Sequence, residues 1–190
     1  MAEDKKKWRE LPATLVLIDE GGFTLVSPLR CTWAPCGCTP VVRTSLDHHE
    51  RINLFGALLV SSDGKQIRLS VRSYHSTLSG QQVIEFLKQL LRQIPGEIVL
   101  VWDRHPIHQR KAVEQLIKGE KRLHVYWFPV SAPELNPAEF IWTQLTEHTA
   151  NTAPHNISEL SKNIFTGIAK IRRTHFRLAY CLSASKLSWK

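Results

Sequence analysis

The stretch "VYWFPVSAPELNPAEFIW", residues 125–142, joins an apolar, strand-like segment to a helix-like one through a loop with three prolines. Asn136 followed by Pro137 is typical of a helix N-cap with proline at the first helical position. This pattern places Glu139 about one turn inside a helix, with Trp142 packed against a sheet. We therefore expect the stiff loop to present the Glu139 carboxylate at a fixed angle. Alternatively, Glu139 is exposed and only complements the helix dipole.

Strand-like segments precede this stretch in pairs. The run "ATLVLIDEGGF" ends in a Gly-Gly turn that lets the chain reverse, and "FTLVSPLR" can return beside it as a hairpin partner. Farther on, "RINLFGALLV" and "KQIRLSVRSY" flank "SSDG", which predicts a second antiparallel pair. The segment "CTWAPCGCTP" between the two pairs is expected to be a loop, because it holds two prolines and a glycine.

From residue 78 onward, helices and strands alternate. The segment "LSGQQVIEFLKQLLRQIPG" predicts a helix with Ser79 as its N-cap and Pro95-Gly96 as its end. The apolar run "IVLVW", the amphipathic "KAVEQLIKG" and the apolar "LHVYWFP" follow, and a helical period runs through "NISELSKNIFTGIAKIRRTHFRLAYCL". Together these elements predict an α/β fold, a mixed sheet flanked by helices on both faces. We expect one domain over 14–182, between a polar leader at 1–13 and a C-terminal tail at 183–190.

The composition favours a non-membrane protein with a polyanionic partner. The chain has 190 residues, 43% of them hydrophobic, and a formal net charge of +8, which favours DNA or another nucleic acid as partner. It contains neither a run of eighteen apolar residues nor a signal peptide, so we expect a cytoplasmic location and no membrane segment. The four cysteines are then expected to be thiols.

Two short motifs raise the alternative of zinc. The cluster "CTWAPCGC" offers Cys31, Cys36 and Cys38, but structural zinc sites usually have four ligands, so incidental loop thiols are the favoured interpretation. The motif "HPIH" offers His105 and His108, yet the intervening proline and the lack of a second ligand pair argue against zinc there.

Three carboxylates suggest a different metal. Asp19 lies at the predicted exit of the first strand and Asp103 at that of a later one, so the two emerge at one sheet edge if their strands are neighbours. With Glu139 they would form an oxygen-rich site suited to Mg²⁺ or Mn²⁺. Two such ions can clamp the attacking and leaving oxygens of a phosphodiester displacement. The alternative is structural, since an aspartate at a strand end is often a turn former or helix cap.

The motifs around these residues resemble the catalytic half of the IS630 and Tc1/mariner transposases. The matching segments are "LIDEGGF", "TWAPCGCTP", "INLFGALL", "VLVWDRHPIH" and "APELNPAEFIW", in the family's order, within residues 14–146. The resemblance implies a ribonuclease-H-like DDE domain in which Asp19, Asp103 and Glu139 are the catalytic, metal-binding residues, with two Mg²⁺ or Mn²⁺ ions. It places His108 at the family's histidine. The implied activity is DNA phosphodiester hydrolysis and strand transfer in transposition.

The resemblance also implies partners. Family members carry helix-turn-helix modules before the catalytic domain, whereas here the first strand begins within fifteen residues of Met1. We therefore expect the second half of a split or truncated transposase, with residues 1–13 as a former linker, a separate or missing DNA-recognition half, homo-oligomers on DNA and a nucleoid-associated location. The alternatives are a structure-selective nuclease of the same fold, or an inactive remnant that binds DNA or a full-length transposase.

The chain departs from the family at four positions, Arg104, Cys36, Cys38 and Thr146, where asparagine, a basic residue, glutamine and lysine are usual. An arginine aimed at the metals would oppose cation binding, but strand alternation is expected to send Arg104 to the other face.

Four residues are candidate accessory or DNA-contacting positions: His108, Asn136, Trp33 and Arg104. His108 either orients a carboxylate or contacts a phosphate, or faces solvent from a helix. Trp33 either stacks on a base or packs its loop onto the sheet, and the latter is favoured. The segment "KIRRTHFR" predicts a basic helical face, either simply solvated or following a DNA backbone.

Overall fold

A five-stranded mixed sheet forms the centre of the molecule. The structure, a computed structural model, describes residues 12–42 and 50–187. The strands lie in the order β3-β2-β1-β4-β5, with β1 antiparallel to β2, β2 antiparallel to β3, and β1, β4 and β5 parallel. Their bounds are β1 Thr14–Thr24, β2 Arg51–Val60, β3 Ile67–Tyr74, β4 Ile98–Trp102 and β5 Leu123–Trp127.

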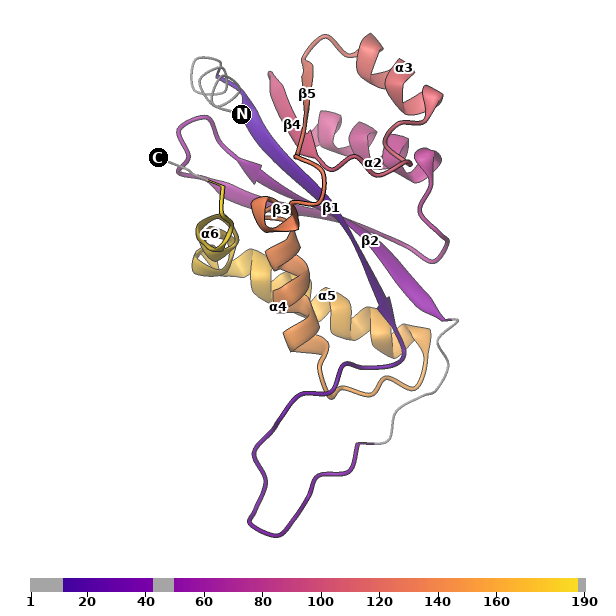
Figure 1. The fold of residues 1–190 in the computed structure, drawn as a ribbon, viewed down its shortest axis with the longest axis vertical. Helices are drawn as coiled ribbons and strands as arrows, with labels where there is room; N and C mark the ends of the chain where they lie inside the picture. Colours follow the sequence, from indigo (N-terminus) through magenta and orange to yellow (C-terminus); the bar gives the residue numbers. More distant parts are fainter. Residues whose placement is uncertain (1–11, 43–49, 188–190) are drawn as a thin grey trace.

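Helices cover both faces of this sheet. In Figure 1, α2 and α3 lie together on one side of β1, and α4, α5 and α6 lie together on the other. Their bounds are α2 Gly80–Gln93, α3 Lys111–Gly119, the short 3-10 helix η1 Pro133–Leu135, α4 Glu139–Thr149, α5 Ile157–Arg173 and α6 His175–Ala184. The predicted α/β class, with a mixed sheet between two helical layers, is confirmed.

Alternation along β1 divides the core in two. Val16 and Ile18 belong to the core that α2 and α3 cover, whereas Leu15 and Leu17 belong to the core that α4, α5 and α6 cover. Successive strand residues point to opposite faces, so a strand buried on both sides reads as a continuous apolar run. The same alternation fixes which face each polar residue of β1 reaches.

Local signals position several elements as expected. The predicted turn between β2 and β3 is present, with Gly64 at a φ of 70°, a conformation that glycine adopts without steric cost. Ser79 caps α2 in a capping box with Gln82, which satisfies amides at the helix start.

The predicted Gly-Gly hairpin is wrong. β1 continues through Gly21 and Gly22 to Thr24, and its antiparallel partner is β2, in which Asp19 pairs with Gly56. The segment "FTLVSPLR" therefore does not return along β1. Gly21 instead leaves room for the ring of Trp142 from α4.

The long C-terminal helical segment is divided. Thr174 has an extended backbone, with φ −112° and ψ 98°, and separates α5 from α6. The predicted single helical period is correct for each part but misses this break. Helix α6 ends at Ala184, so the predicted tail at 183–190 overlaps its last turn.

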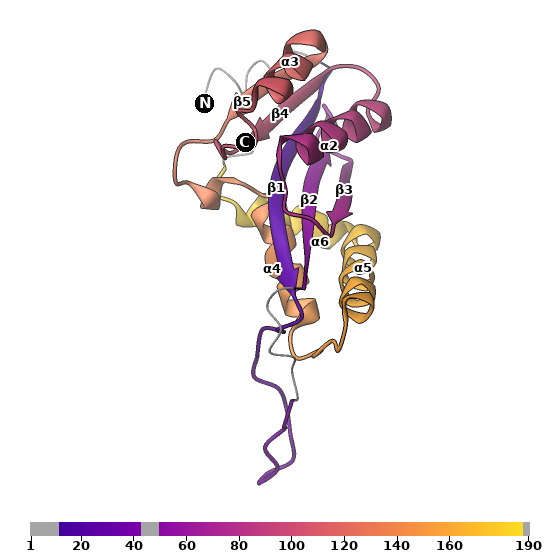
Figure 2. The same ribbon diagram turned by 90° about the vertical axis from the view of Figure 1, so that its right-hand side faces the viewer.

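The loop after β1 extends away from the body of the molecule. Its described part, residues 25–42, is visible in both views (Figures 1 and 2). Trp33 is 101% exposed, so the favoured expectation that it packs the loop onto the sheet is wrong. Cys31, Cys36 and Cys38 are exposed thiols in this loop, while Cys181 is a buried one.

Across the described residues, we find no helix with the length and apolar character needed to span a bilayer. The predicted leader at 1–13 lies almost wholly outside those residues, and the domain boundaries remain predictions.

Candidate metal centre

Parallel pairing of β1 and β4 brings Asp19 and Asp103 to adjacent positions. The register pairs Leu17 with Val101, so each aspartate follows two residues later on its own chain segment. Asp103 comes directly after the end of β4, as predicted. Asp19 does not lie at a strand exit, because β1 continues past it alongside β2; only its pairing with β4 ends there.

Trp142 crosses β1 and β2 where two glycines admit its ring. Its Nε1 donates a hydrogen bond of 2.8 Å to Asp19 Oδ2. A Cβ at Gly21 or Gly56 would lie 2.7 or 2.8 Å from atoms of the indole, well inside the normal separation of carbon atoms. The expectation that Trp142 packs against the sheet is confirmed, and the ring also fixes one oxygen of the Asp19 carboxylate.

Asn136 connects the loop before α4 to β1. Its side-chain Nδ2 donates to the Ile18 carbonyl at 3.1 Å, and its Oδ1 accepts from the Ala138 amide at 3.1 Å. Asn136 is 4% exposed, so these bonds anchor the loop inside the molecule. Glu139 is the first residue of α4 rather than one turn inside it, because Asn136 and Pro137 form a preceding tight turn.

The three predicted carboxylates line one cavity of about 280 Å³. Asp19 comes from β1, Asp103 from the exit of β4 and Glu139 from the start of α4. The loop between β5 and α4 closes one side. The cavity is lined by Asp19, Asp103, Arg104, His105, Phe128, Pro129, Val130, Ser131, Ala132, Pro133, Asn136 and Glu139.

Burial and mutual repulsion both oppose ionisation of two carboxyl groups of this cavity, Asp19 and Glu139. Burial raises the pKa of Asp19 to about 8, helped by the charges of Glu139, Glu20 and Asp103 and opposed by the Trp142 hydrogen bond. Burial also raises the pKa of Glu139, as do the charges of Asp103 and Glu20, against a hydrogen bond with Asp19. The carboxylates therefore lie close enough to disfavour full ionisation together.

His108 contacts Asp103 from outside the cavity. Its Nδ1 lies 3.1 Å from both the carbonyl oxygen and Oδ1 of Asp103, and its Nε2 lies 2.7 Å from Glu20 Oε1. The ring is 1% exposed and stacks on Trp102 at a centroid distance of 4.2 Å. The solvent-facing alternative for His108 is therefore wrong, and the alternative in which it orients a carboxylate is supported.

The electrostatics of this contact follow from its hydrogen bonds. Burial alone would lower the pKa of His108, but the bonds to Asp103 and Glu20 and the Glu20 charge raise it to about 9. Burial likewise opposes ionisation of Asp103, yet bonds from His108 and the His105 amide bring its pKa below the ordinary value. A protonated His108 thus bridges two carboxylates.

Glu20, Asp103 and His108 also bring donor atoms within 4.8 Å of one another, as metal ligands do. Their contacts favour a different interpretation. The imidazole meets the two carboxylates through different nitrogens on opposite sides of the ring, so one ion cannot replace both bonds. We therefore regard this group as a hydrogen-bonded support for Asp103 rather than as the metal site.

Arg104 lies in the lining of the carboxylate cavity, contrary to the expectation that it faces the other side of the sheet. The expectation was wrong because β4 ends at Trp102, and strand alternation does not extend into the loop that follows. The side chain of Arg104 is exposed.

Glu20 is the polar residue of this site that sequence reasoning missed. Asp19 and Glu20 are consecutive in β1, so alternation sends one toward α4 and the other toward the α2 and α3 side. Asp19 meets Trp142, and Glu20 meets His108. An acidic pair in the middle of an apolar strand was the available signal.

Comparisons with known proteins agree with this fold. The sequence model described as "DDE superfamily endonuclease" matches residues 14–161. No curated protein sequence gives a significant match. Among solved structures, the Mos1 transposase paired-end complex with left transposon end has a TM-score of 0.56 at 16% identity, covering 97% of this chain and 62% of that one. The catalytic domain of Mos1 mariner transposase has a TM-score of 0.51 at 14% identity, covering 99% and 95%.

These likenesses confirm the ribonuclease-H-like fold. This chain spans about 62% of the length of the longer Mos1 chain, and it covers nearly all of the isolated catalytic domain. Taken with the family match over most of the sequence, they show that the chain belongs to the DDE superfamily endonucleases.

Proposed function

We propose that this chain is the catalytic domain of a Tc1/mariner-like DDE transposase, which hydrolyses DNA phosphodiesters and joins the freed 3′ ends to target DNA. The observation that carries the proposal is the convergence of Asp19, Asp103 and Glu139 on one cavity. The pKa values of Asp19 and Glu139 are raised by burial and by their acidic neighbours, which is expected of clustered carboxylates whose charge no cation balances.

The residues fit a hard divalent cation. The site offers three carboxylates, and the pKa values of Asp19 and Glu139 are raised, by burial first and by their acidic neighbours second. Oxygen donors of this kind suit Mg²⁺ or Mn²⁺. We propose that Asp19, Asp103 and Glu139 hold two such ions, which when bound polarise the phosphodiester and activate the attacking water.

The remaining residues of the site would hold these ligands in place. Trp142 fixes one oxygen of Asp19, and Asn136 ties the loop that delivers Glu139 to the backbone of β1. His108 fixes Asp103 through Oδ1. Arg104, exposed beside the cavity, is placed to contact a phosphate of the bound DNA.

The neighbouring structures support DNA as substrate. They include Mos1 complexes with a transposon end, with Mn and with Mg, and a Mos1 strand transfer complex with a TM-score of 0.57 at 14% identity, covering 99% of this chain and 62% of that one. By analogy we propose homo-oligomers on DNA and a cytoplasmic, nucleoid-associated location. That a separate helix-turn-helix half recognises the element's ends remains a prediction.

Nicking of supercoiled plasmid DNA in Mn²⁺ tests this function without knowledge of the element's ends. We expect the parent chain to nick, and Asp19→Asn, Asp103→Asn and Glu139→Gln to lose nicking. Glu134→Gln is the matched control, because Glu134 is exposed in the same loop and does not line the cavity.

Two results would contradict the proposal. Nicking by Asp19→Asn or Asp103→Asn at the parent level would remove these residues from the reaction. A parent chain that binds Mn²⁺ and DNA but leaves the plasmid intact would favour the inactive, DNA-binding remnant.

A further inference from the structure

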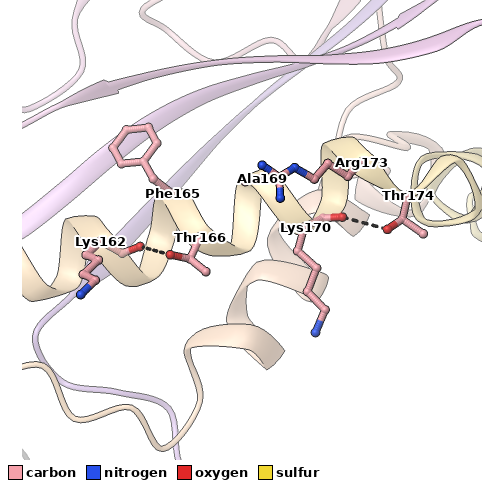
Figure 3. Close-up of a pocket in the computed structure, with 7 residues that line it drawn as sticks. All are labelled: Lys162, Phe165, Thr166, Ala169, Lys170, Arg173 and Thr174. Carbon is pink, nitrogen blue, oxygen red and sulfur yellow. Dashed lines mark hydrogen bonds between the residues drawn. The ribbon is translucent and has the colours of Figure 1, made fainter.

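The outer face of α5 carries a second site candidate. Helix α5 buries Leu160, Ile164, Ile168 and Ile171 toward the sheet. Opposite them, an open depression of about 640 Å³ is lined by Lys162, Phe165, Thr166, Ala169, Lys170, Arg173 and Thr174 (Figure 3). We call this surface the α5 basic face.

The three cations of the α5 basic face are not neutralised. No carboxylate lines the depression, and within residues 12–42 and 50–187 no hydrogen bond or ion pair of the Lys162, Lys170 or Arg173 side chains is found. By contrast, Arg72 of β3 pairs with Glu85 of α2 at 2.9 Å. Burial and the charges of Lys170 and Arg177 lower the pKa of nearby His148, as expected where cations gather.

The spacing of these residues suits a linear polyanion. Lys162, Thr166 and Lys170 recur every four residues and form one row along the helix, and Arg173 extends it. A rise of 1.5 Å per residue puts Arg173 roughly 16 Å along the axis from Lys162. One strand of duplex DNA carries a phosphate about every 3.4 Å of axis, so the row spans several phosphates.

The hydroxyls of this row do not supply hydrogen-bond donors for reading bases. Thr166 Oγ1 donates to the Lys162 carbonyl at 2.7 Å, and Thr174 Oγ1 donates to the Lys170 carbonyl at 3.0 Å. Charge is therefore what the surface offers. Contacts of this kind position DNA without selecting its sequence.

The α5 basic face is separate from the carboxylate cavity. None of its residues lines that cavity. Gly167 of α5 packs against His148, near the end of α4, where an added Cβ would lie 2.6 Å from the imidazole. Glu139, which lines the carboxylate cavity, begins α4. His148 lies nine residues farther along α4, a distance of roughly 13 Å along the helix axis.

We propose that the α5 basic face binds the phosphate backbone of duplex DNA outside the carboxylate cavity. The inference rests on the proposed function, since it assumes that DNA is the substrate. This surface would hold the DNA at phosphates other than the reacting one.

The salt dependence of DNA binding tests this proposal. Binding of a labelled duplex of arbitrary sequence is followed by fluorescence anisotropy in EDTA, from low to high salt. The test variant changes Lys162, Lys170 and Arg173 to Gln. Loss of three phosphate contacts should reduce the slope of log K against log salt by about 0.9 per cation, roughly 2.7 in all.

The matched control changes Lys88, Arg92 and Lys118 to Gln. These three are also two lysines and an arginine, exposed on α2 and α3, so the net charge changes equally. The slope of the control should differ from that of the parent by less than about 0.9, the value of one phosphate contact. Phe165→Ala should retain it as well, because no charge is removed.

Equal slopes for the test and control variants would overturn the proposal, since only net charge would then matter. If the test variant instead alters self-association in sedimentation and leaves the slope unchanged, the surface is an interface between copies, which also overturns it. Failure of the proposed function is distinguishable. In that case the parent chain binds no Mn²⁺ or does not nick DNA, while the test variant still has a smaller salt slope than the control.

Discussion

The carboxylate cavity and the α5 basic face carry charges of opposite sign, and they differ in how firmly the charged side chains are fixed. In the cavity, Asp19 is fixed by Trp142 and Asp103 is fixed by His108, and both contacts come from far along the chain. On α5, Lys162 and Lys170 extend from one helix and bind no described partner. The difference indicates that the cavity is preorganised for a defined geometry, whereas the α5 basic face attracts a polyanion without fixing its position.

The largest expected effect is a loss of stability as pH rises, and it should come from Asp19 and from His108, which supports Asp103. The raised pKa of Asp19, about 8 against 3.8, contributes stability below pH 4 that is lost as pH rises through about 8. His108, raised from 6.5 to about 9, loses its contribution between those values. Each pKa unit corresponds to about 1.4 kcal/mol, so the metal-free chain should lose several kcal/mol between pH 5 and 9.

Urea unfolding at several pH values without metal would measure this. Asp19→Asn should remove the part of the stability loss that occurs at the lower pH values. The variant with Lys162, Lys170 and Arg173 changed to Gln should lose stability with pH as the parent does. Equal stability of the parent at pH 5 and pH 9 would contradict the assigned environment of Asp19.

Glycine substitutions should show how tightly the cavity side is packed. Gly21→Ala places a methyl group 2.7 Å from the Trp142 ring, and overpacking of this kind costs about 1–3 kcal/mol. Gly119→Ala meets nothing within 4 Å at the end of α3, so it should be neutral or stabilise by up to about 1 kcal/mol. Denaturant midpoints of the two variants should therefore move in different directions, and a stabilising Gly21→Ala would refute the close approach of Trp142.

Glu20 should act on metal affinity through His108. Removal of the 2.7 Å contact in Glu20→Ala frees the imidazole that holds Asp103, and losing such a support typically costs about 10–100-fold in metal affinity. Glu20→Gln keeps an acceptor oxygen and should recover part of the loss. Mn²⁺ affinity measured for both variants and for Glu134→Gln would decide, with equal affinity in Glu20→Ala and the parent ruling out the positioning role.

The smallest effect is expected in the loop after β1. Trp33 is fully exposed, so Trp33→Ala should change the free energy of unfolding by no more than about 0.5 kcal/mol. Thermal unfolding would measure it. A loss well above this value would show that the indole packs on the domain after all.

Local sequence patterns predicted most of the fold and marked the three carboxylates that line the cavity. Ser79 and the "SSDG" turn act within a few residues, and Asp103 and Glu139 are marked by the elements that flank them. What failed depended on distant contacts. Gly21 resembled a turn residue because Trp142, which occupies the space above it, lies more than a hundred residues away.

The supports of the site were hidden for the same reason. The bond between Glu20 and His108 joins residues 88 positions apart, and no local pattern predicts such a pairing. Arg104 was misplaced because alternation was applied beyond the end of β4. The break at Thr174 left no signal in the helical period of the residues around it.

Calorimetric titration of Mn²⁺ into the parent chain, beside Asp19→Asn and Asp103→Asn variants of matched stability, tests the central claim most directly. The account predicts binding by the parent, with protons released near neutral pH because Asp19 must ionise, and no binding by either variant. Binding that survives both substitutions, or no binding by the parent, would contradict a metal centre shared by these carboxylates.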